Sequence, residues 1–186
     1  MANRSLKNNG KFGILFVCTG NICRSPMAAG VLKSLLPGEY ANLVHVGSAG
    51  IGALPAFPAS DHAISVCAEE NIDITDHRSR QVSREILDRS QIVFSLSKNH
   101  YDFLRLHYPA YQENGFLLKS FDRKKRRPLG RSVADPIGED KDFYNKVYHE
   151  IKREIKRILP RLLQLVDLYY EKLNAGDEQV NPEKGD

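Results

Sequence analysis

A short loop, Cys18 to Arg24, joins an apolar run to the start of a helix. The run Ile14–Val17 before the loop predicts a buried parallel strand. Ser25-Pro26 after the loop predicts a helix with proline in its first turn. A strand followed at once by a helix predicts an α/β fold, in which such a loop lies beyond the carboxyl end of the sheet.

The residues of this loop favour an anion site that contains a nucleophile. A helix N-terminus offers unpaired N–H groups and the positive end of a dipole, and loop amides can surround one tetrahedral anion. The same field favours thiolate over thiol at Cys18, and the planar guanidinium of Arg24 can bind two anion oxygens. We therefore predict a phosphate site formed by Thr19, Gly20, Asn21, Ile22, Cys23 and Arg24, with Cys18 as the nucleophile.

Composition is that of one soluble globular domain. The chain has 186 residues, of which 41% are hydrophobic and 27% charged, and no apolar run approaches the roughly 20 residues that span a bilayer. Three cysteines, an odd number, favour a reducing compartment, so we expect a cytoplasmic protein. A net charge of +4 suits an anionic substrate but does not by itself indicate nucleic acid. We expect a flexible extension at 1–11, one domain at 12–173 and a disordered tail at 174–186.

Strand and helix patterns alternate along the chain. Pro160 should kink or split the last helix just before it. This order predicts a three-layer α/β sandwich with a parallel sheet. The expected strands are Ile14–Val17, Leu43–Val46, Ile92–Phe94 and Phe116–Leu118, and the expected helices are Met27–Leu36, Ser60–Glu70, Ser83–Leu87, Asn99–Leu106 and Asp140–Leu173.

Four motifs together resemble the low-molecular-weight protein-tyrosine phosphatases, from about Phe12 to Leu173. They are Cys18-x5-Arg24-Ser25-Pro26, Ser48-Ala49-Gly50, His77-Arg78-Ser79-Arg80-Gln81 and Asp135-Pro136. The resemblance implies a flavodoxin-like sheet of four parallel strands and a metal-independent phosphatase without cofactors. It implies a phosphorylated protein as substrate and inorganic phosphate as product.

The resemblance also implies a role for each site residue. Cys18 forms a phosphocysteine intermediate, Arg24 holds phosphate oxygens, and Asp135, followed by Pro136, protonates the leaving group and then activates water. Ser25 donates to the thiolate, Asn21 holds the loop in a left-handed turn, and His77 supports Asn21.

Two positions depart from the tyrosine-specific pattern of the family. Ile137 and Leu54 stand where the substrate slot usually has aromatic walls, as in a branch that acts on phosphoarginine. Ile22 follows the tyrosine-specific pattern, since that branch has threonine there. We expect phosphotyrosine as the substrate, with phosphoarginine as the alternative. A phosphate-binding regulatory module without catalysis is the alternative of another class.

The remaining cysteines and the basic run leave alternatives open. Cys23 is either a core residue or a thiol that traps oxidised Cys18 in a reversible disulfide; a zinc site at Cys18 and Cys23 would need two more ligands. Cys67 suits core packing better than a thiol relay for arsenate reduction. The run Arg123–Arg127 is either a solvated edge or a surface that steers acidic phosphoproteins, and nucleic acid is disfavoured because no aromatic residues interleave. We expect a monomer or weak dimer with no membrane partner.

Overall fold

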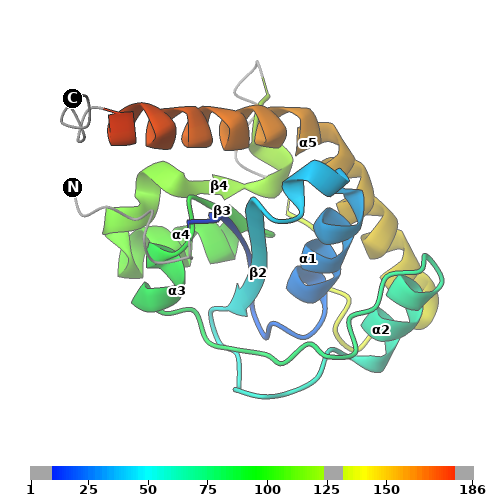
Figure 1. Cartoon of the computed structure of the whole chain (residues 1–186). Coiled ribbons are helices and arrows are strands. Elements are labelled where there is room, and N and C mark those ends of the chain that lie inside the picture. The colour runs from blue at the N-terminus through cyan, green and yellow to red at the C-terminus, as the bar shows by residue number, and fades with distance from the viewer. Residues whose placement is uncertain (1–9, 124–131, 179–186) are drawn as a thin grey trace, which may run out of the picture.

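The computed structural model describes residues 10–123 and 132–178. A four-stranded parallel sheet forms its centre, in the order β2-β1-β3-β4 (Figure 1). Residues 1–9 of the expected extension at 1–11, residues 124–127 of the basic run with the four that follow, and residues 179–186 of the expected tail lie outside the described residues. The strands are β1 (Phe12–Cys18), β2 (Val44–Gly50), β3 (Ile92–Ser95) and β4 (Gly115–Leu117).

Parallel register brings the carboxyl ends of the first three strands together. Cys18 pairs with Gly50 across β1 and β2, and Val17 pairs with Ser95 across β1 and β3. The segments that follow these strands therefore meet at one edge of the sheet, where ligands of open α/β sheets bind. The three-layer α/β fold predicted from the sequence is confirmed.

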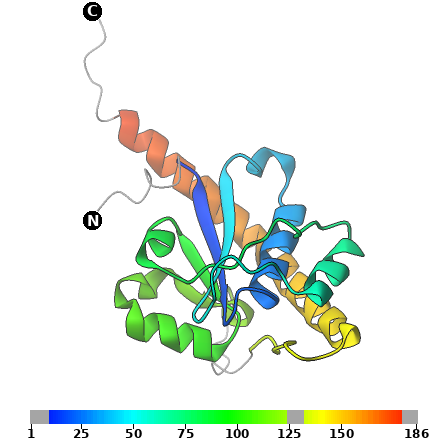
Figure 2. The ribbon, with the colours of Figure 1, turned by 90° about the horizontal axis from the view of Figure 1, so that it is seen from below.

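Helices cover both faces of the sheet (Figure 2). One face packs on α1, α2 and α5 through Phe16, Met27 and Ile151, and the other packs on α3 and α4 through Leu15, Leu87 and Leu104. None of the described helices is long and apolar enough to cross a membrane. The helices are α1 (Arg24–Leu35), α2 (Asp61–Ala68), α3 (Arg84–Asp88), α4 (Lys98–His107) and α5 (Lys141–Glu178), with short 3-10 turns at Gly38–Tyr40, Pro109–Asn114 and Leu118–Ser120.

The last helix agrees with the prediction in part. Of the two effects expected of Pro160, a kink or a split, the split is absent, since Pro160 lies inside a continuous α5; Figure 1 shows this helix changing direction along its length. Ile158 and Leu162, on both sides of the proline, are buried, so core packing outweighs the lost backbone hydrogen bond. The helix also continues to Glu178, past the expected end at Leu173 and into the segment expected to be disordered.

Candidate active site

Cys18 ends β1 and lies under the loop that the sequence assigned to phosphate. Its side chain is buried, and Sγ is 2.9 Å from the Ser25 hydroxyl at the start of α1. Asn21 Nδ2 donates to the same hydroxyl oxygen at 2.8 Å, so the Ser25 proton can point at the sulfur, which is closer than its other acceptor, Ala49 O, at 3.5 Å. Ser25 therefore has the geometry of a donor to a thiolate.

The structure corrects one expectation about Cys18. In the free site, burial raises the pKa of the thiol, and this effect is larger than the opposing ones. The Ser25 hydroxyl, the Ser25 and Asn21 amides and the charge of Arg24 all lower the same pKa. The sequence indicated these stabilising groups correctly, but it could not show how completely the fold removes water from the sulfur.

Asn21 holds the loop in a left-handed turn, as the resemblance implied. Its φ is 56°, and the side chain is completely buried. Asn tolerates this region better than most residues. Its Nδ2 also donates to Ser48 Oγ at 2.9 Å, and its Oδ1 accepts from Arg80 N at 2.9 Å.

His77 supports the same turn through the Asn21 backbone. Its Nε2 lies 2.6 Å from the Asn21 carbonyl oxygen. Burial and the nearby charges of Arg80, Lys33 and Arg78 lower the pKa of His77, although its bond to Asn21 raises it. A carbonyl only accepts, so the neutral ring must carry its proton on Nε2. His77 is thus a structural donor that lies away from the thiol.

Arg24 and Asp135 form an ion pair. Asp135 Oδ2 lies 2.5 Å from Arg24 Nη2, and the arginine side chain is 5% exposed while the aspartate is 44% exposed. Arg24 also donates to Val133 O and to Thr19 Oγ1, both at 3.4 Å, and its buried Nε has no hydrogen-bond partner among the described residues. The loop that ends at Pro136 therefore places a carboxylate beside the guanidinium expected to bind phosphate.

The segment after β2 closes the other side of the loop. Ile51 N donates to Cys18 O at 2.9 Å, and Gly52 N donates to Thr19 O at 3.0 Å. A Cβ atom on Gly50 would lie 2.3 Å from Thr19 O, so only glycine allows this approach. The glycine of the Ser48-Ala49-Gly50 motif is thereby explained.

Three apolar side chains are exposed on the two segments that flank the loop. Leu54 and Ile137, the expected rim residues, are 67% and 57% exposed. Phe57, 53% exposed, was missed by the sequence analysis, although an aromatic residue among prolines and alanines was an available signal. Ser79 fixes its backbone, accepting from Phe57 N at 2.9 Å and donating to Phe57 O at 2.7 Å.

His100 was also missed, because nothing in the sequence connects α4 to the loop. The side chain is buried, with Nε2 3.0 Å from Thr19 Oγ1, the atom that accepts from Arg24. Burial, aided by the charge of Arg24, lowers the pKa of His100 to about 4. His100 is therefore neutral at physiological pH and helps to position Thr19.

This buried histidine should make stability depend on pH. The unfolded chain takes up a proton at His100 below pH 6.5, whereas the folded chain does so only near pH 4. Between pH 6.5 and 4 the unfolded state therefore binds more protons than the folded state. The buried, neutral His100 thus contributes about 3 kcal/mol at most to the free energy of unfolding above pH 6.5, and this contribution is lost as pH falls to 4. Urea unfolding of His100→Asn should show a smaller fall between pH 7 and 4.5 than the wild type. His107→Asn, at an exposed position of the same helix, should retain the wild-type fall; equal slopes for both variants would contradict this assignment.

The other two cysteines are free thiols in the structure. Cys23 Sγ lies 3.1 Å from the Tyr144 hydroxyl and 3.4 Å from that of Ser60, contacts that the sequence did not indicate. Its disulfide with Cys18 stays a prediction. Cys67 is fully buried in α2, and burial raises its pKa to about 12, which suits core packing. Within the described residues, no group of three or more His, Cys, Asp or Glu side chains could hold a metal.

Comparison with known proteins gives the family. The model of low molecular weight phosphotyrosine protein phosphatase matches residues 13–168. The chain belongs to this family. The probable low molecular weight protein-tyrosine-phosphatase EpsP of Ralstonia nicotianae (strain ATCC BAA-1114 / GMI1000) is 37% identical over 66% of this chain and 77% of its own length. A protein-arginine-phosphatase of Geobacillus stearothermophilus is 38% identical over 72% of this chain and 84% of its own.

One solved structure of the family has a phosphorylated residue in its active site. It is a mutant of the arginine phosphatase YwlE with a phosphorylated active site serine, and it superposes with a TM-score of 0.73 at 30% identity. The superposition covers 81% of this chain and 95% of that one. Low molecular weight protein-tyrosine phosphatases are hydrolases that act on phosphate monoesters. The proteins similar to this chain include both tyrosine and arginine phosphatases.

Proposed function

We propose that the chain is a protein-tyrosine phosphatase that works through a phosphocysteine at Cys18. The observation that supports this most directly is the meeting of Cys18, Ser25, Arg24 and Asp135 at one end of the sheet, from segments more than a hundred residues apart. Proteins similar to this chain share the fold and include one phosphorylated on its active site serine. A non-catalytic phosphate-binding module would not need a carboxylate beside Arg24.

The first chemical step transfers the phosphoryl group to sulfur. The substrate phosphate binds to the amides of residues 19–24 and to Arg24, and the Cys18 thiolate attacks phosphorus opposite the leaving oxygen. The sulfur–phosphorus bond forms as the phosphorus–oxygen bond breaks, and protonated Asp135 gives its proton to the departing phenoxide. Charge on the phosphoryl oxygens is stabilised by Arg24 and the amides, so we expect no step to require a metal.

The second step returns the enzyme to its starting state. Asp135, now a carboxylate, takes a proton from a water molecule that attacks the phosphocysteine. The sulfur–phosphorus bond breaks, and inorganic phosphate leaves with Cys18 as a thiolate again. Ser25 donates a hydrogen bond to that thiolate at 2.9 Å, which makes it a better leaving group in this step.

The identity of the phosphorylated side chain depends on the rim and on Ile22. An aliphatic rim of Leu54 and Ile137 can accept either a phenyl ring or an arginine stem, and similar proteins of both kinds exist. We propose phosphotyrosine because Ile22 keeps the tyrosine-specific pattern and because Phe57 adds an exposed aromatic ring on the segment that contacts the loop, where Ser60 N donates to Ile22 O at 2.8 Å. Phosphoarginine is the second candidate, supported by the aliphatic rim.

Turnover in the presence of EDTA tests the activity itself. The wild type should hydrolyse p-nitrophenyl phosphate with EDTA present, and rapid acid quenching followed by mass spectrometry should find one added phosphate on Cys18. Absence of turnover with intact phosphate binding would instead support the regulatory module. Loss of turnover on chelation would contradict the metal-independent mechanism.

Parallel assays on two peptides test the choice of substrate. Phosphotyrosine and phosphoarginine versions of one peptide should give a higher kcat/KM for phosphotyrosine, and Ile22→Thr should shift the ratio toward phosphoarginine by about tenfold, the scale on which pocket contacts discriminate. Ile22→Val, which keeps the pocket apolar, is the matched control and should leave the ratio nearly unchanged. A wild type that prefers phosphoarginine would overturn the assignment.

A further inference from the structure

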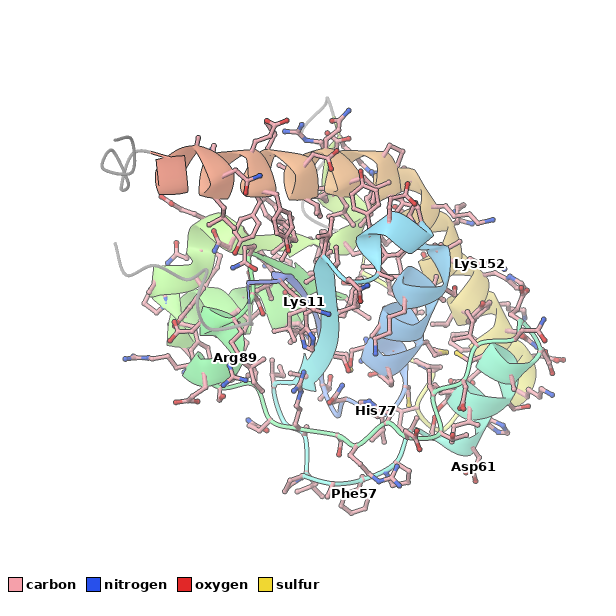
Figure 3. The ribbon with its side chains drawn as sticks, in the orientation of Figure 1. Lys11, Phe57, Asp61, His77, Arg89 and Lys152 are labelled. Carbon is pink, nitrogen blue, oxygen red and sulfur yellow. The ribbon has the colours of Figure 1, made fainter. Side chains whose placement is uncertain are left out.

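A groove runs along the open edge of β2, behind the phosphate loop. It consists of two cavities, of about 380 Å³ and about 300 Å³, that share His45, Gly47 and Arg80. The larger one reaches Lys33 on α1, and the smaller one reaches Arg89 after α3. Figure 3 shows Arg89 on the side of β2 away from α1 and His77 near the lower ends of β2 and α1. We call this feature the β2-edge groove; its size is that of small-molecule sites.

Arg80 lies at the centre of the β2-edge groove with its guanidinium extended over Gly47. Its Nε donates to Ser48 O at 2.9 Å, which fixes the plane of the group at the strand edge. A Cβ atom on Gly47 would lie 2.7 Å from Arg80 Nη2 and 3.7 Å from His45 Nε2, so both groups converge on the glycine. Among the described residues, no acceptor is hydrogen bonded to the two Nη atoms. A planar pair of N–H donors is thus presented to an anion.

Several positively charged side chains lie close enough to His45, in the β2-edge groove, to affect its pKa. Burial and the charges of Arg80, Lys33, Lys11 and Arg89 lower the pKa of His45. The groove also contains acidic residues, but two of the three are engaged: Asp73 accepts from the Thr75 amide and hydroxyl, and Glu85 is hydrogen bonded to Ser83. The third, Asp76, lies with Asp73 in the segment before His77. Among the residues that the structure describes, none of these three carboxylates forms an ion pair with Arg80 or Lys33, so both cations are available to a ligand.

We propose that the β2-edge groove binds a small molecule bearing phosphate groups, with phosphate on the Arg80 guanidinium and Lys33. A phosphate dianion matches the paired donors of Arg80, and Lys33 supplies a second charge from the α1 side. The two cavities leave room for a ligand longer than a single phosphate. This site is separate from the Cys18 loop, since it opens on the edge of β2 and uses none of residues 18–24.

The groove is next to the residues that hold the phosphate loop. Arg80 donates its backbone N–H to Asn21 Oδ1, and His77, which also lines the larger cavity, contacts the Asn21 carbonyl. A ligand on the Arg80 side chain therefore acts on a segment in direct contact with the left-handed turn. We infer that occupancy of the groove changes catalysis through Asn21.

Titration with inorganic tripolyphosphate tests binding without relying on turnover. Orthovanadate first fills the Cys18 loop, and amide resonances of the isotope-labelled protein then report the second site. The resonances of Lys33, His45 and Gly47 should move with tripolyphosphate. Shifts confined to residues 18–24, or none with vanadate present, would overturn the site. Citrate binding as tightly as tripolyphosphate would overturn the assignment to phosphate.

Two variants at Gly47 give a matched test. Gly47→Asp puts a carboxylate beside Arg80 and should weaken tripolyphosphate binding by at least about tenfold, whereas the isosteric Gly47→Asn should weaken it by less than about threefold. The contact at 2.7 Å is with the flexible end of Arg80, so both variants should fold. Lys33→Gln should weaken binding and Lys33→Arg should retain it. Equal affinities for Gly47→Asp and Gly47→Asn would overturn the proposal.

The same two variants, Gly47→Asp and Gly47→Asn, test whether the groove affects catalysis. Tripolyphosphate competes for the Cys18 loop equally in both Gly47 variants, so any difference between their kcat/KM responses comes from the groove. We expect Gly47→Asn to respond beyond simple competition and Gly47→Asp not to. Identical responses, with binding retained in Gly47→Asn, would reject the coupling through Asn21.

Discussion

Cys18→Ser should lower the turnover of p-nitrophenyl phosphate by about 10⁴-fold or more while leaving phosphate binding largely intact. A serine hydroxyl is far harder to ionise than a thiol, and the groups that stabilise a thiolate here are a hydroxyl, amides and Arg24. The same groups cannot offset both the higher pKa of an alcohol and the buried position of residue 18. Steady-state kinetics and isothermal titration with phosphate measure the two quantities.

The matched control removes a thiol that the mechanism does not use. Cys67→Ala changes a buried cysteine of α2 and should keep turnover close to that of the wild type after correction for any unfolded fraction. If Cys18→Ser retained substantial turnover, a nucleophile other than Cys18 would have to be sought. If it lost phosphate binding as well, the assignment of binding to Arg24 and the amides would be wrong.

Local sequence signals predicted the parts of this site that neighbouring residues determine. Apolar runs followed by turn residues gave the strands, and Cys18, Arg24 and Ser25 lie close in sequence and therefore meet at one strand–helix junction. Local sequence signals did not connect Asp135 with Arg24; only the resemblance to a family did so. The structure brings them to 2.5 Å across a separation of 111 positions.

What the sequence did not show depends on contacts between distant elements. His100 contacts Thr19 only because α4 packs beside β3. Tyr144, on α5, contacts Cys23 only because α5 packs against α1. The raised pKa of Cys18 follows from burial, which depends on all of the surrounding layers. The end of α5 was also placed too early, at Leu173, because the Gly- and Glu-containing segment after Asn174 was interpreted as a tail, whereas the helix continues to Glu178.

Asp135→Asn should have the second-largest effect, and its size should depend on the leaving group. A positioned acid contributes on the order of 10²–10⁴-fold when the departing oxygen needs a proton, so phosphotyrosine and phenyl phosphate should lose the most. p-Nitrophenyl phosphate should lose less, because its leaving group is stable as an anion. A series of aryl phosphates should therefore show a steeper dependence of kcat/KM on leaving-group pKa in the variant than in the wild type.

The ion pair adds an expectation that a merely structural aspartate would not produce. Asp135 occupies Arg24 Nη2 in the free enzyme, so an incoming phosphate must compete with a carboxylate for that donor. Asn removes the negative charge, and inorganic phosphate should then bind the variant more tightly than the wild type even as hydrolysis slows. Glu139→Gln, an exposed carboxylate of the same segment, should change neither quantity. A uniform loss across all leaving groups, with weaker phosphate binding, would show that Asp135 only maintains the loop and transfers no proton.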